Sequence, residues 1–295
     1  TALLVAAAFV LTILGQAVTG KVDLKGLFAT AADQATGTYT IFPFTFVFAA
    51  LVFVVMLQLT FVSGREPLRR LPPVAAGLVA LVVAWGVGLI VYVLVVNWSF
   101  VPPPAREALG LHDPGGPVNA LDLVGWLLCV VIWQVTFFIL LGGWPFTAIR
   151  HVAVRVVVSN VVVVGGGWLT YLLLHDAFDW DIPKISAIGG CVAAAVLLQA
   201  MLFETWPYRG PSAVANRVGL VVSSAVVVIV LYWGLRGIGN ATEEWTEYPV
   251  ELWVAGVGLN LMAALVIIHY AMWGRWPFRP PAPPAPTEDV TPERS

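Results

Sequence analysis

The sequence predicts an all-α, polytopic integral membrane protein with about eight transmembrane helices arranged as repeated two-helix hairpins. Three observations lead to this fold class. Hydrophobic residues make up 59% of the 295 residues and charged residues only 11%, far from the balance of a soluble globular domain. The apolar residues gather in stretches of roughly 20, the length that crosses a hydrocarbon core of about 30 Å. A short sequence pattern also recurs near the end of every second stretch.

Eight apolar segments qualify or nearly qualify as spanning helices. The first begins inside an apolar run without a methionine, and a signal peptide is the alternative for it, although no basic residues precede the run. The predicted helices cover residues 1–19, 41–63, 73–96, 121–142, 153–174, 185–204, 214–236 and 251–273.

The distribution of charge predicts the orientation of these helices. Cytoplasmic loops carry an excess of arginine and lysine, and the arginines here follow every second helix. They are Arg65, Arg69, Arg70, Arg150, Arg155, Arg209, Arg217, Arg275 and Arg279, whereas the opposite loops are acidic. With eight spans, both termini are expected on the cytoplasmic side of a plasma (inner) membrane. The net charge of −2 gives no electrostatic support for nucleic-acid binding, so the lipid bilayer and a small solute or ion are the expected partners.

The remaining features of the sequence predict a domain boundary but no disulfide and no metal site. Residues 1–279 are predicted to form a single transmembrane domain, and residues 280–295 a disordered, proline-rich cytoplasmic tail. Cys129 and Cys191 both fall in predicted spans, so they indicate neither a disulfide framework nor a metal site. The heavy use of Ala, Val, Gly, Pro and Arg is typical of a GC-rich bacterial genome.

A repeated pattern links the helices that run toward the arginine-rich side. The segments "MLQLTF", "IWQVTF", "LLQAML" and "IIHYAM" each have a glutamine or histidine at the third position, and a proline follows a few residues later at the predicted end of each helix. Such self-similarity predicts duplicated hairpins with one orientation in the membrane, arranged as a rosette about the membrane normal. The polar residues Gln58, Gln134, Gln199 and His269 precede Pro67, Pro145, Pro207 and Pro277 by nine, eleven, eight and eight residues.

These four polar residues are the candidate substrate- or ion-binding site. Eight to eleven helical residues at about 1.5 Å each place them near the bilayer midplane, where a polar group needs a partner. In a rosette they could converge on a shared solute, and the alternative is a separate helix–helix hydrogen bond for each. His269 alone could titrate or bind a transition metal, but it has no second ligand at a suitable spacing, so no metal site is predicted.

Carboxylates near the helix ends are the next candidates. Glu204, in the last turn of the sixth predicted helix, is a possible gate or proton acceptor if it faces the rosette axis, and pairing with Arg209 is the alternative. Asp122, Asp181 and Glu251 could form an acidic outer mouth that attracts cations.

Three classes of function fit these features. The first is a membrane transporter or channel for a small solute or ion, with a polar midplane site formed by repeated helices. The second is a non-catalytic membrane subunit or scaffold of a larger complex, because so few buried residues are ionisable. The third is a membrane-embedded enzyme that modifies lipids or isoprenoids, but the chain has no HExxH, GxSxG or CxxC motif, so no catalytic residue and no cofactor is assigned.

Overall fold

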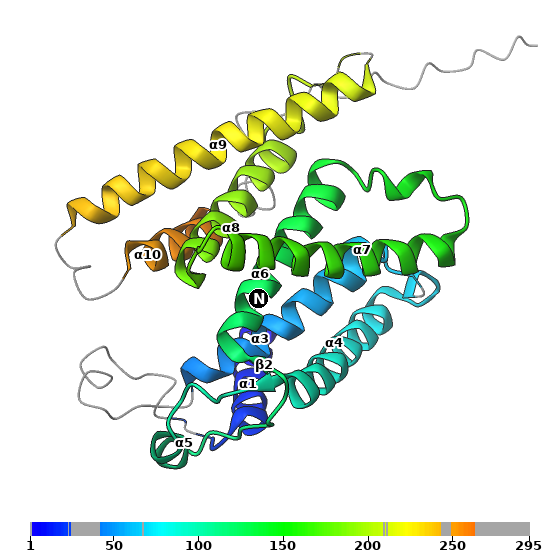
Figure 1. The fold of residues 1–295 in the computed structure, drawn as a ribbon. Helices are drawn as coiled ribbons and strands as arrows, with labels where there is room; N and C mark the ends of the chain where they lie inside the picture. The colour runs from blue at the N-terminus through cyan, green and yellow to red at the C-terminus, as the bar shows by residue number, and fades with distance from the viewer. Residues whose placement is uncertain are drawn as a thin grey trace, which may run out of the picture.

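Figure 1 shows the computed structural model of the chain, which describes residues 2–22, 24, 42–66, 68–208, 210, 212–242 and 249–262. The predicted site residue His269, the residues Pro67, Pro277 and Arg209, and the predicted tail at 280–295 lie outside the described residues. Within the described ranges the protein is all-helical except for one pair of two-residue strands.

Six helices of the described part are long and apolar enough to cross a membrane: Thr45–Val62, Pro73–Val95, Ala120–Leu140, Val152–Ala177, Ile182–Leu202 and Ala213–Ala241. Their bounds agree with six of the predicted spans to within a few residues. The described parts of the first and the last predicted spans contain the apolar helices Phe9–Thr19 and Val250–Leu259, and residues 263–273 of the last span lie outside the described residues.

Most of the long helices change from α- to π-helical geometry before they end. The α-helical parts are α1 (Ala2–Thr19), α3 (Phe42–Leu57), α4 (Pro73–Val95), α6 (Ala120–Gln134), α7 (Val152–Leu172), α8 (Ile182–Leu197), α9 (Ala213–Ala241) and α10 (Val250–Gly256). The π-helical parts are η2 (Gln58–Val62), η4 (Val135–Leu140), η6 (Leu173–Ala177), η7 (Leu198–Leu202) and η9 (Val257–Met262). Short 3-10 turns, η3 (Leu68–Arg70) and η5 (Phe146–Ala148), follow α3 and α6.

The helices form a central row and a peripheral layer (Figure 1). The central helices are α3, α6, α8 and α10, and each packs against the next, while α1 packs on α3. The peripheral helices α4, α7 and α9 pack on α3, α6 and α8 respectively. In the most apolar stretch of each central helix, 39% (α3), 50% (α6) and 56% (α8) of the residues are buried inside the protein. In the peripheral helices the corresponding shares are only 17% (α4), 22% (α7) and 17% (α9). The peripheral helices therefore present most of their apolar surface outward, as lipid-facing helices do.

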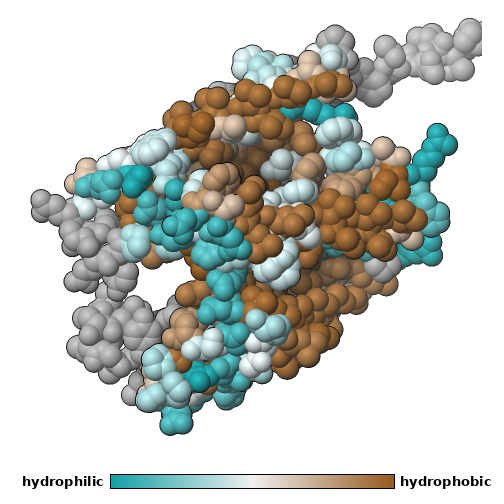
Figure 2. All heavy atoms as spheres, viewed as in Figure 1, coloured by the Kyte–Doolittle hydropathy of each residue, from teal (hydrophilic) through white to brown (hydrophobic). Residues whose placement is uncertain are grey.

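The outer surface agrees with this arrangement. Figure 2 shows hydrophobic side chains covering α9, α7 and α4 between hydrophilic groups gathered at opposite ends of these helices. On α4, the side chains of Val74 and Val82 are at least 70% exposed although both are apolar. Exposed apolar surface of this extent is stable only in contact with lipid or another apolar partner.

Small residues set the distance between the two layers. A Cβ atom added to Gly167 of α7 would lie 2.8 Å from the backbone nitrogen of Val130 of α6, and one added to Gly88 of α4 would lie 2.9 Å from Val52 of α3. Between central helices, a Cβ on Gly258 would meet Gly190 at 2.8 Å. The glycines thus allow close backbone approach, which is the usual role of small residues between membrane helices. The α-helix continues without a break through the three glycines at residues 165–167.

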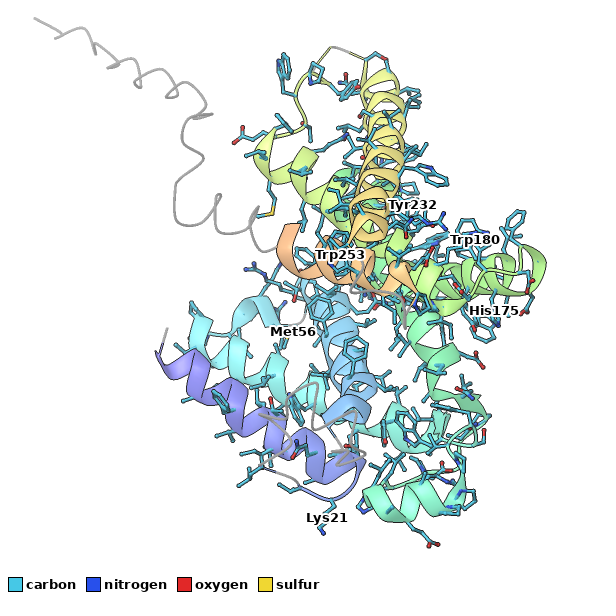
Figure 3. All side chains as sticks on the ribbon, turned by 90° about the vertical axis from the view of Figure 1, so that its left-hand side faces the viewer. Lys21, Met56, His175, Trp180, Tyr232 and Trp253 are labelled. Atoms are coloured by element: carbon cyan, nitrogen blue, oxygen red, sulfur yellow. The ribbon has the colours of Figure 1, made fainter. Side chains whose placement is uncertain are left out.

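Three tyrosines pack the peripheral helices against the interior of the protein, near the helix ends opposite the arginine-rich loops. Tyr92 of α4, Tyr171 of α7 and Tyr232 of α9 are 1%, 2% and 8% exposed. Tyr92 packs edge-on against Phe48 of α3. Tyr232, labelled in Figure 3, belongs to a buried cluster against which Trp253 of α10 packs. These tyrosines therefore lie inside the protein and not in a lipid-facing belt.

The connection between α4 and α6 has structure that the sequence pattern did not predict. Strand β1 (Val96–Asn97) pairs in parallel with β2 (Val118–Asn119), and the chain between the two strands contains helix α5 (Pro103–Leu109). Gly110, at φ +63°, ends α5, and its carbonyl accepts a hydrogen bond from the backbone of Lys21 at 2.9 Å. The end of α1 is thereby joined to this loop.

Candidate solute site between α3 and α6

The ends of α3, α6 and α8 have the same backbone structure three times, which we call the helix-end motif. The π-helical segments η2, η4 and η7 are each followed by a backbone N–H that bonds five residues back, a second that bonds six back and a third that bonds three back, whereas η6 is followed by the first two of these bonds. The five-back bonds are Ser63 to Gln58, Leu141 to Thr136 and Phe203 to Leu198, at 2.8, 3.0 and 3.0 Å. The six-back bonds are Arg65 to Leu59, Gly143 to Phe137 and Thr205 to Gln199, at 3.0, 2.7 and 2.8 Å. The three-back bonds start from Glu66, Trp144 and Trp206, directly before the prolines.

The same motif requires two successive residues with positive φ. The pairs are Gly64 and Arg65, Gly142 and Gly143, and Glu204 and Thr205, with φ between +48° and +85°. Only the middle copy uses glycine at both places, and a non-glycine residue at positive φ is uncommon. The tight reversal is therefore a property of the backbone at all three helix ends and does not depend on one residue type.

The helix-end motif corrects the alignment of the polar residues. Its hydrogen bonds make Gln58 equivalent to Thr136 and Leu198, because these three carbonyls accept the five-back bond. Gln134 then lies two positions before this point and Gln199 one position after it. Each of the three glutamines lies near the end of its own helix, but they do not occupy equivalent positions in the helix-end motif. The motif therefore does not bring their amides together by symmetry.

Gln58 and Gln134 nevertheless meet between α3 and α6. The Nε2 atom of Gln134 donates to Oε1 of Gln58 at 3.0 Å and to the backbone carbonyl of Val54 at 3.1 Å. A backbone carbonyl can only accept, so the contact with Val54 fixes which end of the Gln134 amide is nitrogen. Gln134 is 0% exposed and Gln58 is 9% exposed.

Each glutamine of this pair has one polar atom that makes no hydrogen bond within the pair. Among the described protein residues, neither Nε2 of Gln58 nor Oε1 of Gln134 has a hydrogen-bond partner, and both atoms are buried. A buried polar group without a partner costs about 1–3 kcal/mol. The pair therefore offers one donor group and one acceptor to a small molecule that carries the complementary groups, and it carries no charge.

Gln199 lies in a different environment. Its amide is half-buried and hydrogen-bonded to α9, with Nε2 donating to Ser223 Oγ at 2.9 Å and Ser224 Oγ donating to Oε1 at 3.1 Å. The opposite orientation of the amide also contacts both serines. Gln199 thus joins α8 to α9, and none of the hydrogen bonds described for it reaches Gln58 or Gln134.

The structure places Glu204 in the helix-end motif, at φ +48° and half-buried. It occupies the position of Gly64 and Gly142 in the other copies, and its backbone carbonyl accepts a hydrogen bond from Thr205 Oγ1 at 2.5 Å. Arg209, its predicted partner, and His269, the fourth predicted site residue, lie outside the described residues.

The three carboxylates of the predicted outer mouth each have a local partner. Tyr171 donates its hydroxyl to Asp122 at 3.0 Å, which joins α7 to α6. Asp181 caps α8 by accepting from the backbone N–H of Lys184 at 2.9 Å. Glu251 of α10 forms an ion pair of 3.3 Å with Arg236 of α9. No hydrogen bond or ion pair described here joins one of these carboxylates to another.

Sequence reasoning missed the polar residues that face these helix ends from the peripheral layer. Asn160 of α7 donates to Ser63 Oγ at 3.0 Å, and Ser159 donates to the carbonyl of Val62 at 3.4 Å. The serines that bind Gln199 belong to the same class. The signal was present as two adjacent polar residues, "SN" and "SS", inside otherwise apolar helices.

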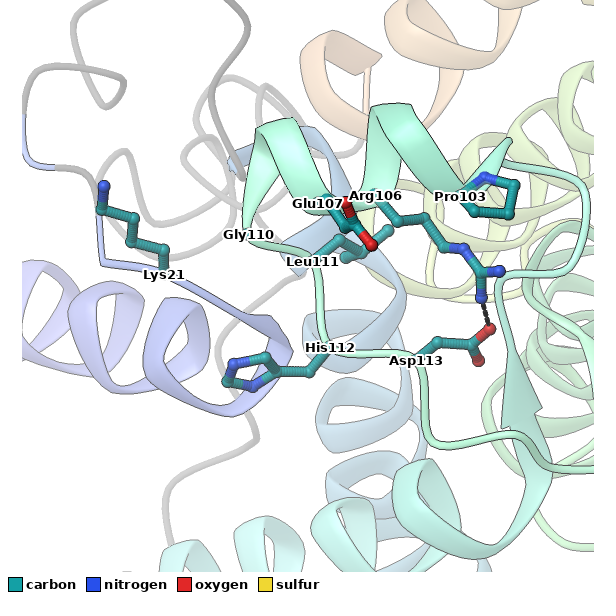
Figure 4. A pocket seen from close by; sticks show the side chains of 8 residues that line it. All are labelled: Lys21, Pro103, Arg106, Glu107, Gly110, Leu111, His112 and Asp113. Carbon is teal, nitrogen blue, oxygen red and sulfur yellow. Dashed lines mark hydrogen bonds and ion pairs between the residues drawn. The ribbon is translucent and has the colours of Figure 1, made fainter.

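A separate cavity of about 360 Å³ lies at the loop that contains α5 (Figure 4). Arg106 and Asp113 form an ion pair in its wall, drawn as the dashed line. Asp113 also accepts from the backbone N–H groups of Trp98 and Gly115, at 3.1 and 3.0 Å. These contacts give Asp113 a structural role in folding the loop.

Metal-binding chemistry has no support within the described ranges. No group of three or more His, Cys, Asp or Glu residues in this part of the chain could hold a metal ion. Both cysteines are free and buried.

The chain was compared with protein-family models, with curated proteins and with solved structures, and none of them matches it. The functional argument therefore depends on the geometry of the site itself.

Proposed function

We propose that the protein is a membrane transporter or channel for a small solute or ion, with a polar site centred on the Gln58–Gln134 amide pair. The uncommitted donor and acceptor of this pair, both buried between two apolar helices, are the observation that carries the proposal. Polar groups inside membrane segments are costly and are typical of substrate pathways. A neutral amide pair favours a neutral hydrogen-bonding solute, since a bare ion needs charged groups or several oxygens to replace its water.

The proposal includes eight spans built as repeated hairpins. Three copies of the helix-end motif and the alternation of central and peripheral helices support duplication of a two-helix unit. α1 and α10 supply the two further spans, because α1 runs alongside α3 and α10 alongside α8. The prolines at 67, 145 and 207 and the nearby arginines then mark the cytoplasmic side of a bacterial inner membrane, with both termini inside.

A non-catalytic scaffold is the second candidate. It is favoured by the direct 3.0 Å contact between Gln58 and Gln134, which also fits an ordinary hydrogen bond between packed helices. In that case the repeated helices build an interaction platform, and no solute enters the protein. A membrane-embedded enzyme is the third candidate, and the described residues offer no metal cluster to support it.

Flux through proteoliposomes distinguishes the first candidate from the second. The purified chain would be reconstituted in vesicles, and entry of urea and glycerol would be followed by stopped-flow light scattering, with potassium flux measured in parallel. We expect the wild-type protein to accelerate at least one of these fluxes above that of empty vesicles. Gln134→Leu should abolish the acceleration, because it removes the acceptor and the contact that orients Gln58.

Gln199→Leu is the matched control for this experiment. It removes an amide of the same type from another inward-running helix, but the Gln199 amide bonds to α9 and not to Gln58 or Gln134. Flux should therefore survive in this variant. If wild-type protein gives no flux of urea, glycerol or potassium, or if Gln134→Leu and Gln199→Leu behave alike, the scaffold becomes the better account.

A further inference from the structure

Two cavities that share the lining residue Met56 lie along α3 and α4, and together we call them the groove. Its first part is a cavity of about 750 Å³ between η2, the turn that follows it and the first turns of α4. Its walls are apolar along the helices, with Leu59 from η2 and Ala76, Gly77 and Ala80 from α4. Its mouth is basic, because Arg65 and Arg69 line it at the helix end.

The second part of the groove is a cavity of about 450 Å³ between α1, α3 and α4. Met56, labelled in Figure 3, lines both cavities, and the neighbouring residues Ala80 and Leu81 of α4 line one each. The second part is almost entirely apolar and aromatic, with Phe53 and Trp85 in its wall. The whole groove therefore changes from basic at one end to apolar along its length.

The dimensions fit within one leaflet of a bilayer. Gly64 and Met56 are eight residues apart, which is at most about 12 Å at the α-helical rise of 1.5 Å per residue, and the π-helical segment η2 between them is shorter than an α-helix with the same number of residues. Half of a hydrocarbon core of about 30 Å is roughly 15 Å, so the basic mouth lies at headgroup level when Met56 lies near the acyl chain ends.

The charges at the mouth favour an anion. Within residues 64–71, Arg65, Arg69 and Arg70 stand against one carboxylate, Glu66. Glu66 pairs with Arg69 at 3.3 Å, but the Arg69 side chain is 61% exposed, and exposed ion pairs are weak. Arg69 also donates Nε to the carbonyl of Gly64 at 2.9 Å, which holds its guanidinium beside the mouth. Guanidinium groups bind phosphate oxygens in bidentate geometry.

We infer that this groove binds an anionic phospholipid, with the phosphate at Arg65 and Arg69 and an acyl chain passing Met56 into the apolar cavity. Charge complementarity at the mouth selects the headgroup, and the continuous apolar wall selects a lipid over a free anion. Basic pockets between membrane helices on the arginine-rich side are suited to such headgroups. This inference does not depend on the transport proposal.

Thermal unfolding of the purified full chain in detergent tests the inference. Phosphatidylglycerol, phosphatidylcholine with the same acyl chains, and glycerol 3-phosphate would be added separately. A ligand that binds only the folded state raises the midpoint temperature, so phosphatidylglycerol should raise it by several degrees more than either other addition. Equal shifts with both lipids, or a full shift with glycerol 3-phosphate, would overturn the inference.

Two matched pairs of variants locate the effect. Arg65→Asn with Arg69→Gln should remove the preference for phosphatidylglycerol, and Arg150→Gln, at an exposed arginine outside the groove, should retain it. Asparagine is chosen at position 65 because it tolerates the positive φ there.

The second pair fills the groove without touching charge. Gly77 lines the first cavity, whereas Gly86 lies elsewhere on α4, and an added Cβ meets nothing within 4 Å at either position. Gly77→Leu should therefore lose the phosphatidylglycerol shift, and Gly86→Leu should keep it. A shift that survives in Gly77→Leu contradicts the assigned binding site even if the double arginine variant fails to fold.

Discussion

Replacing Gly167 with alanine tests the close backbone contact between α7 and α6. The added Cβ would lie 2.8 Å from the nitrogen and 2.9 Å from the Cα of Val130, and both atoms belong to backbone that cannot rotate away. Ordinary carbon contacts are about 3.5–4.0 Å, so α7 would have to move about 1 Å from α6. Overpacking of this kind costs roughly 1–3 kcal/mol, and alanine recovers about 0.5–1 kcal/mol as the better helix former. We expect a net loss of about 1–2 kcal/mol.

Gly165→Ala is the control two residues away on the same helix. An added Cβ there meets nothing within 4 Å, so this variant should be neutral or slightly more stable than wild type. Both variants would be unfolded by SDS titration in mixed micelles and followed by tryptophan fluorescence. Equal stability of Gly167→Ala and Gly165→Ala would refute the close packing of α6 and α7.

Two further predictions concern polar contacts between central and peripheral helices. Gln199→Leu should lower the free energy of unfolding by about 1 kcal/mol, because the amide makes two hydrogen bonds to Ser223 and Ser224 and each hydrogen bond between membrane helices is typically worth about 0.6 kcal/mol; a loss of several kcal/mol in the same SDS titration would contradict a simple contact. Tyr171→Phe should cost about 1 kcal/mol through loss of its hydrogen bond to Asp122, and a double-mutant cycle with Asp122→Ala should show that the two changes are not additive.

The positions of the helices could be predicted from the sequence because hydropathy depends on each residue and on no neighbour in space. Helices α4, α6 and α9 begin within a residue of the predicted spans. The outer loop could not be predicted in the same way. Strands β1 and β2 have two residues each and lie on either side of α5, so only their pairing in space defines them.

The candidate site shows the limit of sequence reasoning more clearly. The repeated sequence segments lie near the ends of three helices, but they suggested that three glutamines are equivalent. The backbone hydrogen bonds set the true register, and a shift of one or two residues turns a helical side chain by about 100° or 200°. Gln134 therefore reaches Gln58, while Gln199 turns to the serines of α9.

Cysteine accessibility at Gln58 and Gln134 tests the central claim most directly. Each residue would be replaced singly by cysteine in a background lacking Cys129 and Cys191, with Gln199→Cys as the comparison. A small water-soluble thiol reagent would then be applied to intact membranes, and folding would be checked by the unfolding midpoint. A hydrated solute site predicts labelling at positions 58 and 134 that exceeds labelling at position 199. Folded variants that remain unlabelled at both 58 and 134 would show a dry contact between α3 and α6, and would contradict the proposed pathway.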